Sequence, residues 1–110
     1  MKFLMITKSI PGAPPPTPDQ MMELGRFTEE MIKSGVVLLT GGLIRPSTGM
    51  QIRSAGGKIS VTDGPYIESK EQMAGYVLID VPTKEEAVKL AGENPMAEYG
   101  TVEVRPVYTF

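Results

Sequence analysis

The sequence of 110 residues contains no cysteine and no histidine. Without cysteine there is no disulfide, no thiolate nucleophile and no cysteine-ligated zinc, and a chain of this size without such crosslinks is expected in a reducing cytoplasm. Without histidine, Ser-His-Asp and Cys-His pairs are excluded, and the commonest general base and metal ligand is missing. Any catalysis must therefore use Asp, Glu, Lys, Arg or Tyr side chains, or a borrowed metal.

The chain also lacks a strong charge of either sign and a long apolar run. Eleven Lys and Arg residues against thirteen Asp and Glu give a net charge of -2, so we expect no direct nucleic-acid partner. The apolar run near the start, residues 3–6, is shorter than the roughly 7–15 residues of a signal sequence or the roughly 18 of a membrane span. We therefore predict no membrane anchor. No glycine spacing typical of nucleotide sites occurs and no Ca²⁺-loop spacing occurs, so neither a cofactor nor a metal is predicted.

The sequence contains two signals for the start of a helix. Thr17, Pro18, Asp19 and Gln20 form a capping box with proline at the first helical position, which predicts a helix over residues 18–34 that ends before Gly35. Thr83 opens a second capping box and predicts a helix of about ten residues that ends near Gly92. In the first helix, helical spacing predicts that a set of apolar residues faces the core. This set comprises Met21, Leu24, Phe27 or Thr28, and Met31, and we expect Met22 in the core as well.

Short β-branched and alternating segments predict the strands. They cover residues 2–7, 36–39, 48–53, 58–62, 75–81 and 101–107, and the third and fourth form a hairpin around residues 55–57. With the helices, the order is two β-α-β halves separated by the hairpin. We therefore predict one α+β domain over residues 1–110: a ferredoxin-like antiparallel sheet with both helices on one face and an inserted β-hairpin.

The last two strands of this sheet have two different faces. Val77, Ile79 and Val81 alternate with more polar positions and should lie beneath the helices, together with Val102 and Val104. The opposite face would then hold a mixed set of side chains: Tyr76, Leu78, Glu103 and Arg105. Such a face is too apolar to be fully hydrated and too charged for a core, so we expect pairing with a second copy as a homodimer, with the charged members lining a cleft.

Several motifs resemble the DGPF domain of the YCII-related family. They are Val-Thr-Asp-Gly-Pro-Tyr at residues 61–66, Glu68, Ser-Lys-Glu-Gln at 69–72, Gly-Tyr at 75–76 and Val-Glu-Val-Arg-Pro-Val at 102–107. The opening strand, the Gly-Gly-Leu turn at 41–43 and the helix at 83–91 also fall where that family has them, so the resemblance covers essentially the whole chain. Tyr66 stands where the family name has Phe.

The resemblance implies a ferredoxin-like protomer that forms a dimeric α/β barrel with a cleft of small-molecule size. Some similar proteins hold a His and an Asp together in the cleft. Asp63 matches the acidic partner by motif, but this chain has no His, so that pair is not carried over. Members of the DGPF group are often encoded beside alternative sigma factors, which implies a regulatory or accessory setting.

Asp63 and Arg105 are the candidate polar anchors. Asp63 precedes Gly64 and Pro65, so its carboxylate is expected either to accept backbone N–H bonds in a turn or to act as a cleft base. Arg105 and Glu103 lie two apart on one strand and should pair with each other. Arg105 alternatively holds a substrate carboxylate. The remaining candidate ligand contacts are three hydroxyl donors: Tyr66, Tyr76 and Tyr99.

Two functions follow as hypotheses. In the first, a cytoplasmic homodimer binds a small anionic or carbonyl-bearing molecule through Asp63 and Arg105, with Asp63 as the base if the protein is a His-independent isomerase or lyase. In the second, the protein is a non-catalytic regulatory or interaction module associated with sigma-factor systems. Whether it is an enzyme is left open by the residues. The missing His favours the second hypothesis, whereas unpaired polar groups in the cleft would favour the first.

Overall fold

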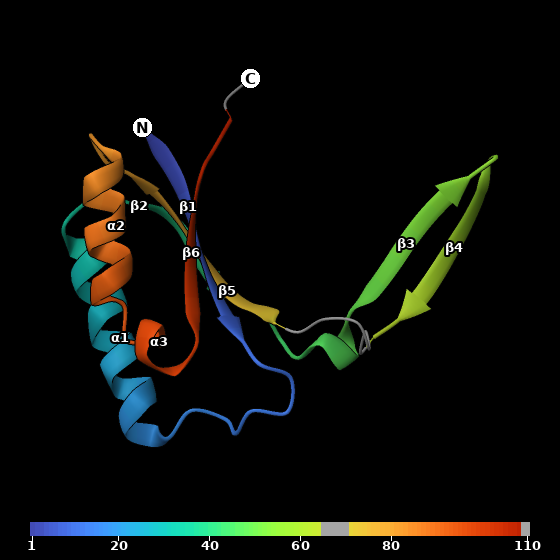
Figure 1. Ribbon diagram of the computed structural model, residues 1–110, viewed down its shortest axis with the longest axis horizontal. Helices are drawn as coiled ribbons and strands as arrows, with labels where there is room; N and C mark the ends of the chain where they lie inside the picture. The colour runs from blue at the N-terminus through green and yellow to red at the C-terminus, as the bar shows by residue number, and fades with distance from the viewer. Residues whose placement is uncertain (65–70, 109–110) are drawn as a thin grey trace.

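The computed structural model describes residues 1–64 and 71–108 (Figure 1). Its elements, in chain order, are β1 (Lys2–Ser9), α1 (Pro18–Lys33), β2 (Val37–Gly42), the 3-10 helix η1 (Pro46–Thr48), β3 (Met50–Ala55), β4 (Lys58–Asp63), β5 (Gln72–Asp80), α2 (Lys84–Glu93), α3 (Met96–Tyr99) and β6 (Thr101–Pro106). The predicted strands and both long helices are present, with bounds that differ by a few residues.

Four strands form one antiparallel sheet in the order β2-β5-β1-β6, and β3 and β4 form a separate hairpin. This order joins the two β-α-β halves in the way predicted from the sequence. Helices α1 and α2 lie on the same side of the sheet, and the hairpin stands on the opposite side, away from the sheet (Figure 1). The sheet therefore has a helix-covered inner face and an outer face without helices.

The core lies between the inner face and the two helices. Phe3 and Met5 of β1 pair with Ile79 and Val77 of β5 and are almost fully buried, as the alternation of these strands requires. The helices contribute Met31, Ala87 and Ala91 to the same cluster, and Val102 and Val104 pack against it. The predicted inner positions of the last two strands are confirmed.

The cap of α1 is present as the sequence predicts, whereas α2 shows only the Thr83 side-chain bond of its predicted capping box. The backbone N–H of Gln20 donates to Thr17 Oγ1 over 3.2 Å, and the Gln20 side chain accepts from the Thr17 N–H over 2.8 Å. Gly35 follows α1 with φ +83°, a conformation that favours glycine. At α2, Thr83 accepts from the Glu86 N–H over 3.2 Å. Within the described residues, no helix combines the length and apolarity needed to cross a membrane.

One expectation about the helices is wrong, and one short helix was not predicted. Met21 and Met22 are 54% and 59% exposed and lie outside the core cluster; Met21 lines a pocket beside the first turns of α1. The short helix α3 was not predicted, because its four residues follow Pro95 and lack a side-chain cap, so they carry no start signal.

The hairpin pairs Ile52 with Val61 and turns at Gly56 and Gly57, whose φ values of +57° and +79° are readily adopted only by glycine. Its strands begin at Met50 and Lys58, so the predicted strand at 48–53 lies two residues further along the chain. Every residue of β3 and β4 is exposed.

Candidate functional site

A pocket of about 530 Å³ lies between α1 and the inner face of the sheet, and we call it the α1 pocket. It is formed where β1 and β2 end and β5 begins, beside the core and not within it. Its lining is Thr7, Pro16, Met21, Leu24, Phe27, Thr28, Met31, Thr40, Gly41, Gly42, Leu43, Ala74, Gly75, Tyr76, Val77, Asn94 and Met96. This volume falls within the range of small-molecule sites.

Glycine in the sheet helps to leave this space open. A Cβ atom on Gly75 would lie 2.9 Å from Thr7 Oγ1 and 3.2 Å from the Gly41 carbonyl oxygen, so a larger residue does not fit without movement of a strand. Glycine inside a strand often marks such a close approach. The strand backbone at Gly41 and Gly75 and the Thr7 hydroxyl therefore form the floor of the pocket.

Two buried polar residues line the pocket. Thr7 is only 8% exposed, and its hydroxyl has no hydrogen-bond partner within the described residues. Since no completely enclosed polar side-chain atom in this part of the chain lacks a partner, the Thr7 hydroxyl must be reached by solvent through the pocket. Asn94 accepts from the Met96 N–H over 2.9 Å, and its Nδ2 lies 3.5 Å from Met5 Sδ. One of its two amide protons is therefore available to a ligand.

The two other threonine hydroxyls of the pocket are already donors to backbone. Thr28 Oγ1 donates to the Leu24 carbonyl over 2.9 Å, and Thr40 Oγ1 donates to the Tyr76 carbonyl over 3.2 Å. Each can still accept a hydrogen bond. Apart from Tyr76, the lining contains no ionisable side chain, and the described residues contain no cluster of acidic side chains that could hold a metal.

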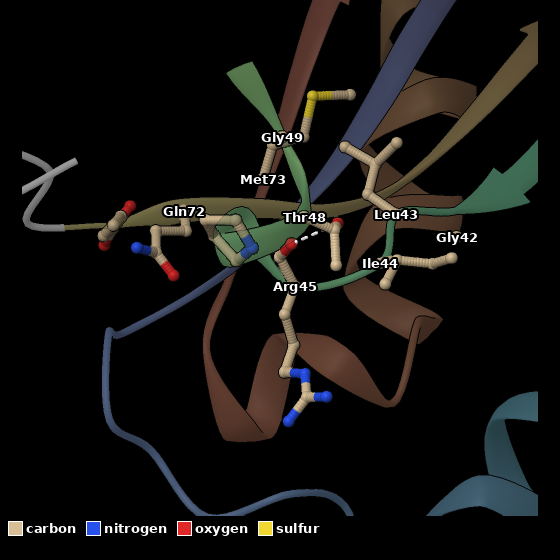
Figure 2. Close-up of a pocket in the computed structure, with 10 residues that line it drawn as sticks. Gly42, Leu43, Ile44, Arg45, Thr48, Gly49, Gln72 and Met73 are labelled. Carbon is tan, nitrogen blue, oxygen red and sulfur yellow. Dashed lines mark hydrogen bonds between the residues drawn. The ribbon is translucent and has the colours of Figure 1, made fainter. Parts of the chain in front are cut away.

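A second pocket, of about 510 Å³, lies at the base of the hairpin (Figure 2). It is formed by residues 42–49 and the start of β5, and Thr48 Oγ1 donates to the Arg45 carbonyl over 2.6 Å across its loop. The Leu43 and Met73 side chains lie to one side, whereas the Arg45 guanidinium extends to the other (Figure 2). Ile44 is 78% exposed, so this pocket is an apolar surface groove with charged ends at Arg45 and Glu71.

Tyr99 lines a third, smaller pocket of about 240 Å³ near the start of β6. Its hydroxyl donates to Glu23 Oε2 over 3.3 Å, which connects α3 to α1. Partial burial raises the pKa of Tyr99, and the nearby Glu23 carboxylate raises it further. The hydroxyl therefore stays protonated and is engaged in a structural bond.

Glu103 lies on the outer face between two cations. Its carboxylate hydrogen-bonds Nε of Arg105 and lies 2.5 Å from Lys8 Nζ. These contacts, first the bond from Arg105 and then that from Lys8, hold the pKa of Glu103 below its ordinary value. The predicted pairing of Arg105 with Glu103 is present, and the guanidinium remains two-thirds exposed.

The structure does not gather the predicted site residues into one place. Asp63 ends β4 in the hairpin and Arg105 lies in β6 of the four-stranded sheet. The Asp63 side chain is exposed, with no hydrogen bond or ion pair to any described residue. The Tyr76 hydroxyl lies over Gly41, and Tyr66 lies outside the described residues.

Sequence reasoning missed Thr7 and Asn94. Thr7 carried a signal, because it follows Phe3 and Met5 at the same strand period and so is a polar residue at an inward position. Gly75 carried another, as a glycine inside a strand. Asn94 gave none, since its role depends on the fold bringing residue 94 beside residue 5.

Comparison with known proteins agrees with the sequence motifs. The YCII-related domain matches residues 1–110. A curated relative, an uncharacterized protein of Rhizobium meliloti, is 30% identical over 89 residues, which are 79% of this chain and 72% of that protein. Among solved structures, the 5-chloro-2-hydroxyhydroquinone dehydrochlorinase of Burkholderia phenoliruptrix, in complex with 2,5-dihydroxybenzoquinone, is similar in fold. Its TM-score is 0.51 at 10% identity, over 98% of this chain and 94% of that one. The chain belongs to the YCII-related domain family.

Proposed function

We propose that this protein is a homodimer that binds a small, uncharged, mainly apolar molecule with a carbonyl or hydroxyl group in the α1 pocket. The observation that carries the proposal is the hydroxyl of the buried residue Thr7, which has no partner in the described structure and opens into a pocket of about 530 Å³. A hydroxyl that faces a pocket and has no protein partner can exchange its bond to water for a bond to a ligand carbonyl or hydroxyl.

The walls of the pocket support an uncharged ligand. Leu24, Phe27 and Met31 supply apolar contact from α1, and the Thr7 hydroxyl and the Asn94 amide supply a few fixed polar contacts. No Lys, Arg, Asp or Glu lines it, so a charged group would lose its hydration without gaining a counter-ion. This narrows the ligand class predicted from the sequence, which included anions, to carbonyl-bearing or hydroxyl-bearing molecules.

Asp63 and Arg105 line none of the three pockets described. Proton transfer by Asp63 in an isomerase or lyase step stays a prediction, and it requires the partner copy to bring the carboxylate to the ligand. The solved structure that is similar in fold is of an enzyme and holds a quinone. Neutral quinones without acidic hydroxyl groups are therefore reasonable first probes, together with neutral cyclic ketones and lactones.

The test is calorimetric titration of the wild-type protein with these probes and with small carboxylates as a contrast. We expect the neutral carbonyl compounds to bind and the carboxylates not to bind. Thr7→Val should weaken binding about five-fold, the loss of one hydrogen bond of about 1 kcal/mol. Asp63→Asn should leave binding unchanged. Preferential binding of carboxylates that Arg105→Ala abolishes would instead place the ligand at the outer face.

The non-catalytic interaction module remains the second candidate, favoured by one observation. The α1 pocket contains no group suited to general acid–base catalysis near neutral pH, whereas many large apolar side chains lie exposed elsewhere. This candidate predicts that the protein binds the probes without converting them. It also predicts that the dimer surface is required for binding of a cellular partner.

A further inference from the structure

The hairpin has one apolar and one polar face. Strand alternation places Met50, Ile52, Ile59 and Val61 on one face, and each is more than half exposed. The other face is polar or small: Gln51, Arg53, Ala55, Lys58, Ser60 and Thr62. We call β3–β4 the arm and the first set its apolar face.

An isolated two-stranded hairpin is at best marginally stable in water, and it needs further strands or a packed face. Among residues 1–64 and 71–108 the arm pairs only within itself, and it stands on the outer side of the four-stranded sheet, away from it (Figure 1). Each exposed side chain of the apolar face leaves roughly 100 Å² in contact with water, so the patch is about 400 Å², comparable to the largest apolar patch of a typical monomer, which is often functional. The patch is exposed among the described residues, so it is available to a partner.

Within the described structure, the outer face of the sheet has no helix on it and is partly exposed, with Leu4 and Leu78 half-buried and Ile6 buried. Leu39 of β2, Leu78 of β5 and Leu4 of β1 lie in one row across it, and Leu39 is 57% exposed. Six residues per strand make the arm about 20 Å long, and four strands spaced about 4.8 Å apart make the sheet roughly 15–19 Å wide. The arm is long enough to cross the whole sheet.

The exposed area also fits an assembly of this chain. A monomer of 11.9 kDa is expected to expose about 6,000 Å², whereas this chain exposes 8131 Å². The excess of about 2,000 Å² is more than the roughly 800 Å² that each partner contributes to a stable interface. The charges are complementary as well, because the apolar face carries the Asp63 carboxylate at its root and the outer sheet face carries the exposed guanidinium of Arg105.

We propose that the apolar face of the arm docks on the outer sheet face of a second copy, and that each copy covers the other in the same way. The chain carries both surfaces, so two equivalent contacts close a symmetric dimer without leaving either surface free. The inference rests on the homodimer in the proposed function and is independent of its ligand. It makes the inserted hairpin the exchanged element of the dimer and brings Asp63 of one copy toward Arg105 of the other.

Because the chain has no cysteine, single introduced cysteines report this contact directly. Ile52→Cys places a thiol on the apolar face of the arm, Leu39→Cys places one on the outer sheet face, and Gln51→Cys is the matched control on the polar face. Ile52→Cys protein is mixed with tagged Leu39→Cys protein and treated with a bismaleimide of about 10 Å reach. We expect at least ten-fold more crosslinked heterodimer than when Gln51→Cys replaces Ile52→Cys. Equal yields, or crosslinks between two Ile52→Cys arms in place of the sheet, would overturn the proposed docking.

Molar mass by light scattering separates this inference from the homodimer itself. We expect a wild-type dimer, a monomer when Ile52 and Val61 are both replaced by Asp, and a dimer when Gln51 and Thr62 are both replaced by Asp. A dimer that survives the first pair of substitutions overturns arm docking and leaves the homodimer intact. A monomeric wild-type protein overturns both. The single-cysteine test decides the question even if the charged variants fail to fold.

Discussion

Replacing Thr7 by valine should make the protein more stable and a weaker binder at the same time. Valine keeps the β-branched shape and suits a central strand, while it removes the hydroxyl of a residue that is 8% exposed, a hydroxyl without a partner in the described structure. A buried hydroxyl without a partner costs about 1–3 kcal/mol. Because water reaches this one through the pocket, we expect a gain near the lower limit, about 1 kcal/mol.

For a domain of this size, 1 kcal/mol corresponds to a rise in melting temperature of roughly 4–8 °C. Scanning calorimetry of the ligand-free protein measures this rise, and urea unfolding at 25 °C gives the change in the free energy of unfolding. Titration with the best carbonyl probe should show an affinity about five-fold lower than that of the wild type.

Thr40→Val is the matched control, because it makes the same change in the same pocket. The Thr40 hydroxyl donates to the Tyr76 carbonyl across β2 and β5, so its loss should destabilise the protein by about 0.5–1.5 kcal/mol. If Thr7→Val destabilises the protein as much as Thr40→Val does, the Thr7 hydroxyl has a structural partner and the reasoning about the pocket fails.

Three further predictions concern the ends and the outer face of the fold. Thr17→Ala removes the cap of α1 and should lower the free energy of unfolding by about 1 kcal/mol, which urea denaturation measures; no change would mean that solvent replaces the cap. The pKa of Glu103 is lowered in the folded protein, so its contribution to stability is present above its ordinary value near 4.5 and is lost as pH falls through the folded value. Urea midpoints should therefore fall more steeply on acidification in the wild type than in Glu103→Gln, and parallel curves would contradict this. Arg105→Asp should weaken the dimer, and adding Asp63→Arg should restore it, as measured by sedimentation in low salt. If the second substitution does not restore the dimer, the two charges do not meet across the interface.

Much of the fold could be predicted because its signals are local. The box at Thr17 fixes the start of α1, and the alternation around Val77 fixes which side of β5 meets the helices. The arm was predictable from its paired glycines at 56 and 57, although β3 begins and ends two residues later than predicted. Each of these features depends on residues fewer than five positions apart.

The site was less predictable because it depends on distant contacts. Met21 has helical spacing suited to the core. The spacing alone does not show that this turn of α1 lies beside a pocket. Thr7 and Asn94 become neighbours of one pocket only when β1 and the end of α2 meet. Asp63 and Arg105 were grouped by motif, but the structure places them in separate sheets of one chain.

The central claim is that a ligand occupies the α1 pocket, and the methionine methyl groups test it most directly. The eight methionines include Met21, Met31 and Met96 at the pocket, Met73 at the base of the arm and Met50 on its apolar face. In protein labelled with ¹³C at these methyls, titration with a neutral carbonyl probe should shift the three pocket signals in NMR spectra and leave Met50 and Met73 unchanged. Shifts confined to Met73 or Met50, with the pocket signals fixed, would contradict the account.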